Sequence, residues 1–174
     1  MTKVFRSFAA AVVAVLLSIV AVQPAQSGPA ELALLSSYVG SWSGKGLMTG
    51  GDFPEEFKCR LTVSKGTQAK INYAGRCSLV NMNISVTGTI AFDDKSQRYQ
   101  AAMSSNAGFT GMAIGRKQGE RITFNLAEQQ VDRGGNNVRI GSVLVLVDDT
   151  IVVDFEVEFN NSGQILTARV PFQR

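Results

Sequence analysis

The sequence contains no histidine. Histidine is the commonest catalytic acid or base near neutral pH and the commonest protein ligand of transition metals. Its absence excludes Ser-His-Asp and Cys-His catalysis, histidine-ligated haem, and the usual catalytic sites for zinc, copper and non-haem iron. An enzyme built on this chain would have to work with carboxylates alone.

Cysteine is nearly absent as well, with only Cys59 and Cys77. Two thiols are too few for a structural zinc site, and their spacing is far from the Cys-x-x-Cys arrangement of a redox pair. Both fall on the same face of alternating segments, at equal distances from Gln68 in the intervening turn region. A symmetric hairpin would set them opposite one another, so we predict a structural Cys59–Cys77 disulfide.

Acidic residues therefore remain the candidates for catalysis or calcium binding. The candidate groups are Glu55-Glu56, Asp93-Asp94, Asp148-Asp149 and the alternating set Asp154, Glu156 and Glu158. The first three groups lie in turn regions, where aspartate is common for backbone reasons, and the last lies on one polar strand face. No segment fits the twelve-residue calcium loop. We expect a non-enzyme with no catalytic residue, no metal site and no cofactor.

The chain has one long hydrophobic run, at its N-terminus. Lys3 and Arg6 precede about 15 largely apolar residues between positions 8 and 22, and the small residues of Ala25-Gln26-Ser27 follow. This is the pattern of a cleavable secretory signal, and the run is shorter than the ~20 residues that span a bilayer. We predict a signal peptide over residues 1–27, a single domain over residues 28–174, a periplasmic or secreted location, and no transmembrane span in the mature protein.

Strong charge of either sign is also absent. The formal net charge is +3, and without Lys3 and Arg6 the remaining 15 basic and 14 acidic residues give +1. The basic residues are scattered in sequence, and Lys45, Lys58 and Arg60 are offset by acidic residues between positions 52 and 56. Nucleic-acid binding, which needs a basic stripe with interleaved aromatic residues, is disfavoured.

What the sequence has in abundance is alternation of apolar and polar residues. Pro29 to Val39 has the spacing of a short helix, and Gly40 ends it. After Gly40 the period is two residues, in about ten segments that include 57–64, 70–77, 83–92, 122–126 and 151–159. Such segments, joined by short turns, are typical of a barrel or a sandwich. We predict an all-β, antiparallel, up-and-down β-barrel of about 8–10 strands with a short N-terminal capping helix.

One hairpin fixes its own register. A two-residue turn at Asp148-Asp149 places Arg139 opposite Glu158 on the outer face. The same register leaves an outer valine patch, which consists of Val143, Val145, Val147 and Val152. Either a loop or the N-terminal helix covers this patch, or it is a surface for self-association or for an envelope protein partner.

A resemblance to a known family appears at Gly40-Ser41-Trp42. This segment resembles the Gly-x-Trp signature of lipocalins and related calycin barrels, and residues 35–46 are similar to the opening of nitrobindin-like barrels. The resemblance implies that Trp42 plugs the closed end of the barrel and that a basic residue of a late strand, matched here to Arg169, packs over it. Nitrobindin-like haem binding needs a histidine ligand, so haem binding does not carry over.

These observations favour a ligand-binding protein. We expect an exported calycin-like barrel that binds a small, largely apolar ligand. Its candidate ligand-binding residues are Trp42, Tyr73, Phe92, Phe124 and Phe155, all of which could instead simply fill the core. The alternative is an envelope structural or interaction module with a filled barrel, which acts through the outer valine patch.

Overall fold

The computed structural model describes residues 27–80, 82–132 and 134–174. The signal peptide predicted over residues 1–27 lies outside these ranges except for Ser27, and it remains a prediction, as does the domain boundary. The described elements are α1 Ser27–Ser37, β1 Gly40–Thr49, β2 Glu55–Lys65, β3 Lys70–Ser78, β4 Asn83–Asp93, β5 Arg98–Ser105, β6 Thr110–Gln118, β7 Arg121–Val131, β8 Asn137–Val147, β9 Thr150–Phe159 and β10 Gln164–Gln173.

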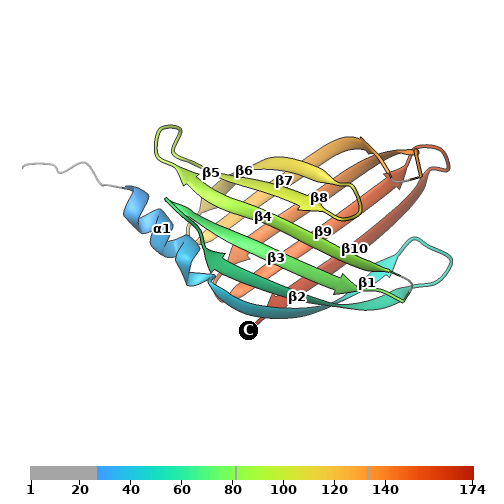
Figure 1. The fold of residues 1–174 in the computed structure, drawn as a ribbon, viewed down its shortest axis with the longest axis horizontal. Helices are drawn as coiled ribbons and strands as arrows, with labels where there is room; N and C mark the ends of the chain where they lie inside the picture. The colour runs from blue at the N-terminus through green and yellow to red at the C-terminus, as the bar shows by residue number, and fades with distance from the viewer. Residues whose placement is uncertain (1–26, 81, 133) are drawn as a thin grey trace, which may run out of the picture.

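The ten strands form one closed barrel (Figure 1). Each strand pairs antiparallel with the next one in the sequence, and β10 returns to pair with β1. Among the described strands, each strand therefore has a neighbour on both sides, but β6 and β7 pair only at residues 115–118 with residues 121–124, so residues 110–114 of β6 have no paired residue on β7. The predicted fold class, an antiparallel up-and-down barrel with a short N-terminal helix, is confirmed.

The strands form because their apolar residues recur at every second position. In β2, Phe57, Cys59, Leu61 and Val63 are buried, and the residues between them are exposed. Successive side chains of a strand point to opposite faces of the sheet. One face of each strand therefore contributes to the lumen of the barrel, and the other faces outward.

The hairpin of β2 and β3 carries the disulfide. Cys59 and Cys77 are direct cross-strand partners, with Cα atoms 4.0 Å apart, and their sulfurs are bonded. Gln68, in the turn between the two strands, has a φ of 61°. The Cys59–Cys77 disulfide predicted from the symmetry of this hairpin is confirmed.

The hairpin of β8 and β9 has the register that its turn predicts. Val147 pairs with Thr150, and Asp148 has a φ of 49°, as a tight two-residue turn requires. Arg139 lies opposite Glu158, and its Nη1 atom is 2.5 Å from Glu158 Oε2. A turn of two residues leaves no freedom to slip, so it fixes every pair along both strands.

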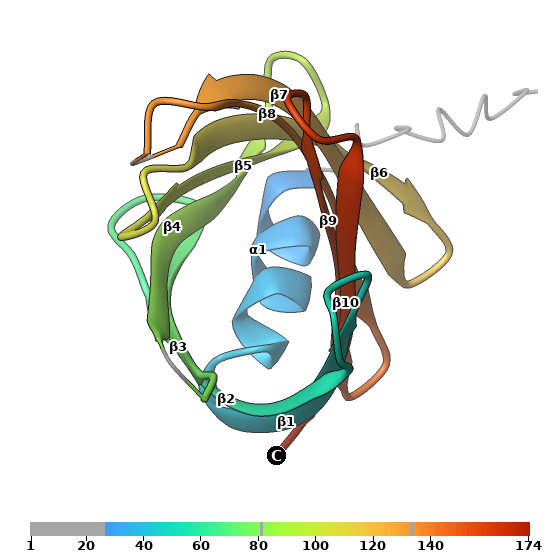
Figure 2. The same cartoon turned by 90° about the vertical axis from the view of Figure 1, so that its right-hand side faces the viewer.

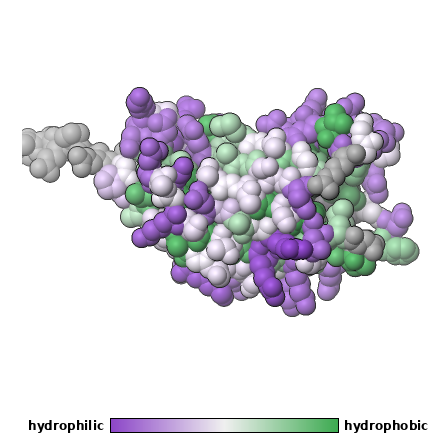
Figure 3. Space-filling model, in the orientation of Figure 1, coloured by the Kyte–Doolittle hydropathy of each residue, from purple (hydrophilic) through white to green (hydrophobic). Residues whose placement is uncertain are grey.

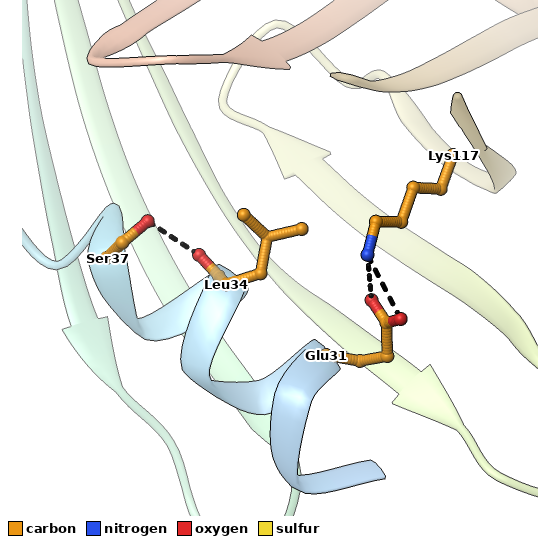
Figure 4. Close-up of polar contacts among 4 residues, drawn as sticks. All are labelled: Glu31, Leu34, Ser37 and Lys117. Atoms are coloured by element: carbon orange, nitrogen blue, oxygen red, sulfur yellow. Dashed lines mark hydrogen bonds and ion pairs between the residues drawn. The ribbon is translucent and has the colours of Figure 1, made fainter. Parts of the chain in front are cut away.

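Helix α1 caps one end of the barrel. It lies against β3 and β4, and in the view along the barrel axis it crosses behind the ring of strands (Figure 2). Lys117 Nζ, in β6, is 3.1 Å from Glu31 Oε2, and the Ser37 hydroxyl donates a hydrogen bond to the Leu34 carbonyl at 2.7 Å (Figure 4). We call this the helix end, and the opposite end, where the β1–β2 and β3–β4 loops lie, the loop end.

Trp42 plugs the helix end beneath α1. Its indole N–H donates to the Tyr38 carbonyl at 2.9 Å, and the Arg174 guanidinium carbon lies 4.7 Å from the centre of its ring. The assignment of Arg169 to this position is wrong, because Arg169 faces outward and pairs with Asp154 at 3.1 Å. The register that places Ser43 opposite Gln173 brings Arg174 beside Trp42.

Within the described part of the chain, no helix is long and apolar enough to cross a bilayer.

Candidate functional site

The barrel contains a cavity of about 240 Å³ that is partly open to solvent. It extends from Tyr38 at the helix end to Leu79 and Phe109 at the loop end. Its walls are almost wholly apolar, with side chains from nearly every strand of the barrel. The interior is therefore hollow along part of its length rather than filled by side chains.

The cavity exists because aromatic rings lie flat against the wall instead of projecting into the lumen. Phe124 is the direct cross-strand partner of Gly115, and a Cβ atom on Gly115 would lie 2.5 Å from Cε1 of that ring. Phe57 and Gly46 repeat this arrangement on β2 and β1, with a distance of 2.5 Å to Phe57 Cζ. Each glycine supplies the space that a neighbouring ring occupies, as at strand positions where another group approaches the backbone closely.

Tyr73 follows the same rule and adds a polar group to the wall. Its ring lies over its partner Gly88, and its hydroxyl donates to the Ala102 carbonyl at 3.2 Å. Burial raises the pKa of Tyr73 to about 12, so the phenol stays protonated at neutral pH. Its oxygen keeps lone pairs that can accept a hydrogen bond from a ligand.

The structure separates the five predicted ligand-binding residues into two groups. Tyr73, Phe124 and Phe155 line the cavity. Trp42 and Phe92 are buried away from it, Trp42 under α1 and Phe92 against Tyr99 with ring centres 5.0 Å apart. An aromatic residue at an inward-facing strand position is predicted to be buried. Its height along the barrel axis then decides whether it faces the cavity.

Phe109 is a cavity residue that the alternation pattern did not indicate. It follows β5 in the β5–β6 turn, and its ring centre is 6.4 Å from that of Phe155. The two rings adjoin a small buried cluster of Val138, Ile140 and Val157. Aromatic side chains thus narrow the cavity toward the loop end.

The outer valine patch lies on β8 and β9, as predicted from the hairpin register. Val145 is only 5% exposed, and Val143, Val147 and Val152 are half-buried. Helix α1 does not cover them, because it lies against β3 and β4. An open groove of about 590 Å³ runs beside the patch on the outer wall, where Gly141 contributes no side chain.

Several of the acidic residues take part in turns and surface ion pairs. The Ser96 hydroxyl and the Lys95 amide hold the pKa of Asp93 below its usual value. Asp154 and Glu158 pair with Arg169 and Arg139. Among the residues that the structure describes, no three histidine, cysteine, aspartate or glutamate side chains converge as metal ligands.

No protein-family model and no curated protein matches this sequence. Among solved structures, the chain is similar to Rv2717c from M. tuberculosis, with 17% sequence identity and a TM-score of 0.61 over 83% of this chain and 98% of that one. It also matches a de novo designed fluorescence-activating β-barrel, with 14% identity and a TM-score of 0.42 over 80% of this chain and 95% of that one. The first likeness supports the barrel fold.

Proposed function

We propose that this protein is an exported, non-catalytic, calycin-like barrel that binds a small apolar ligand in its lumen. The observation that supports this most directly is the cavity of about 240 Å³ with an almost wholly apolar wall. Binding sites for small molecules are concave, mostly apolar and largely preformed, with a few polar groups that orient the ligand. The Tyr73 hydroxyl is such a group here.

The volume limits the size of the ligand. A cavity of roughly 150 Å³ lined by Leu, Ile and Phe holds one benzene molecule, so about 240 Å³ corresponds to about ten non-hydrogen atoms. Drug-sized ligands need at least ~300 Å³. The expected ligand is therefore a one-ring or two-ring compound or a short acyl chain.

The chemistry of the wall favours an apolar occupant over water. A buried water needs two to four polar partners, and most of this lining offers none. An apolar ligand would gain dispersion contacts on all sides that an empty or hydrated lumen lacks. Phe124 and Phe155 present ring surfaces for such contacts.

Two further features support a relationship to calycin barrels and an exported location. The Gly40-Ser41-Trp42 segment lies at the helix end with Trp42 buried and Arg174 over its ring, which supports a calycin-like barrel. The Cys59–Cys77 disulfide supports an oxidising compartment, because such bonds are rare in the cytosol.

Native mass spectrometry of the protein purified from its own envelope tests the proposal, with a bound small mass as the expected result. A second test titrates naphthalene into the wild type, Ala113→Phe and Ala127→Phe. Ala113 lines the cavity, and Ala127 is exposed on the outer wall. We expect binding by the wild type and by Ala127→Phe and its loss in Ala113→Phe; equal binding by all three folded proteins would place the site outside the lumen and overturn the proposal.

A further inference from the structure

The outer wall of β1, β2 and β3 gathers four basic side chains. Lys45 lies directly opposite Lys58 across β1 and β2, and Arg60 lies directly opposite Arg76 across β2 and β3. All four side chains are exposed. We call these four residues the basic wall. Figure 3 shows hydrophilic side chains gathered over β2 and β3 on this face.

Like charges directly opposite one another destabilise an antiparallel sheet. Such pairs therefore suggest that the charges serve a function other than stability. On β8 and on β10, which adjoins β1, the cations Arg139 and Arg169 each lie opposite an acidic residue and form an ion pair with it. Among the described residues, no ion pair involves any member of the basic wall. Glu56 is the one acidic residue that shares this outer face of β2. The four cations therefore outnumber Glu56 on this wall. Asp52 and Glu55 lie beyond it, next to Phe53 at the loop end.

Apolar side chains protrude beside the basic wall at the loop end. Phe53 in the β1–β2 loop is 84% exposed, and Val80 and Met82 in the β3–β4 loop are 77% and 55% exposed. A Glu55 carboxylate oxygen accepts a hydrogen bond from the Val80 amide, which ties the two loops together. We call Phe53, Val80 and Met82 the apolar tips.

The basic wall and the apolar tips belong to the same end of the barrel. Arg76 is two residues from the end of β3, and Lys58 is three residues from the start of β2. At about 3.3 Å per residue, these two positions lie roughly 7–10 Å from the strand ends. Lys45 and Arg60 are four and five residues from the loop-end limits of their own strands, or roughly 13–17 Å. Long basic side chains at the shallower depth would meet lipid headgroups while the tips enter the boundary of the acyl chains.

We propose that the loop end of the barrel docks on an anionic lipid bilayer, with the apolar tips inserted and the basic wall on the headgroups. A nucleic acid would match the charge of the wall, but it offers no apolar phase for Phe53, Val80 and Met82. An anionic bilayer matches both surfaces. The apolar tips do not line the cavity, whereas Arg60 and Arg76 of the basic wall also border it. Vesicle binding and naphthalene binding are measured separately, so failure of one does not decide the other.

Co-sedimentation with vesicles of phosphatidylcholine alone and of phosphatidylcholine mixed with phosphatidylglycerol tests this docking. We expect binding to the mixed vesicles, with an affinity that falls as salt is raised. Each basic residue near an anionic surface strengthens binding about fivefold, so Arg60→Gln with Arg76→Gln should weaken it by about fivefold to 25-fold, with the larger part from Arg76, which is nearer the strand end. The matched control, Arg116→Gln with Arg121→Gln, removes the same charge at the helix end and should change it little.

A second pair of variants tests the apolar tips. Phe53→Ser should weaken vesicle binding about tenfold or more, because a Phe side chain then no longer leaves water. Phe53→Trp should keep binding and shift its added fluorescence to shorter wavelength when mixed vesicles are present. Failure to bind mixed vesicles at low salt, equal losses in the two arginine pairs, or an unshifted Phe53→Trp emission would each overturn the proposal, as would binding to a short DNA duplex without binding to vesicles.

Discussion

Replacement of Gly115 by alanine tests why the barrel is hollow. The added Cβ would lie 2.5 Å from Cε1 and 2.8 Å from Cζ of Phe124, and 2.8 Å from the Cβ of Tyr99. Real Cβ contacts are not this short, so the Phe124 ring must leave the wall and tilt into the lumen. Overpacking of this kind costs about 1–3 kcal/mol, and we expect Gly115→Ala to lower the free energy of unfolding by that amount.

A double-mutant cycle with Phe124→Leu separates the ring from any other effect of the alanine. Leucine lacks the Cε1 and Cζ atoms that the new Cβ would meet, so it relieves the main clash, although the contact with Tyr99 remains. Phe124→Leu alone should cost about 1–2 kcal/mol, less than the ~3–5 kcal/mol of a Phe→Ala change. The double variant should be more stable than the sum of the two losses predicts, by at least about 1 kcal/mol.

Urea denaturation of the four proteins, followed by Trp42 fluorescence, measures the cycle. Gly141→Ala is the matched control, because its Cβ would face the outer groove, with Glu156 Cβ 3.7 Å away as its nearest neighbour. It should be neutral or stabilising by up to about 1 kcal/mol, since alanine loses less backbone entropy than glycine on folding. Additive losses within about 0.5 kcal/mol for Gly115→Ala and Phe124→Leu would refute the explanation that glycine holds the ring against the wall.

Three further predictions concern the disulfide and the tyrosines. Reduction of the Cys59–Cys77 bond, with a sequence separation of 18, should lower the free energy of unfolding by about 3 kcal/mol, and urea curves with and without reductant that coincide would contradict this. Within the described chain the buried Tyr99 hydroxyl has no hydrogen-bond partner, so Tyr99→Phe should raise the melting temperature through a gain of about 1 kcal/mol, and a loss would show that the hydroxyl is bonded. Burial raises the pKa of Tyr38 and Tyr73 to about 12, with the nearby acidic turns contributing for Tyr38. The folded state therefore holds these protons more tightly than the unfolded state, and stability that is complete below pH 10 should fall between about pH 10 and 12. The loss should be roughly 2–3 kcal/mol for Tyr73 and smaller for Tyr38, because solvent partly screens its charge; tyrosinate absorbance that rises fully near pH 10 in the folded protein would contradict it.

The sequence predicted the fold well because the signal for a strand is local. Apolar residues at every second position define a strand and its inner face without any knowledge of the neighbouring strand. A tight or symmetric hairpin also fixes which residues of two adjacent strands lie opposite one another, so the sequence predicts that strand pairing as well. The turn at Asp148-Asp149 set Arg139 opposite Glu158, and the turn around Gln68 set Cys59 opposite Cys77.

The candidate site was predictable only in part. Alternation placed Tyr73, Phe92, Phe124 and Phe155 on inward-facing positions, and of these four only Phe92 lies outside the cavity. Trp42, which came from the Gly-x-Trp resemblance, also lies outside it. Parity gives the face of a strand, whereas the cavity depends on height along the barrel axis and on the residue across each strand pair. An inward glycine opposite an aromatic residue is the sequence signal for a hollow layer, and it can be read only once the register is known.

The sequence by itself thus determined the alternation, the turns, the disulfide and the antiparallel all-β class, whereas the pairing of β10 with β1 that closes the barrel belongs to the tertiary structure. Only the tertiary structure decided that Arg174 rather than Arg169 covers Trp42, and that Lys45 and Lys58 meet across two strands although acidic residues lie between them in the sequence. The physical reason is the same in each case. Alternation acts between residues two positions apart in one strand, but cavities, ring stacking and charged walls are made between strands, where the register sets which side chains meet.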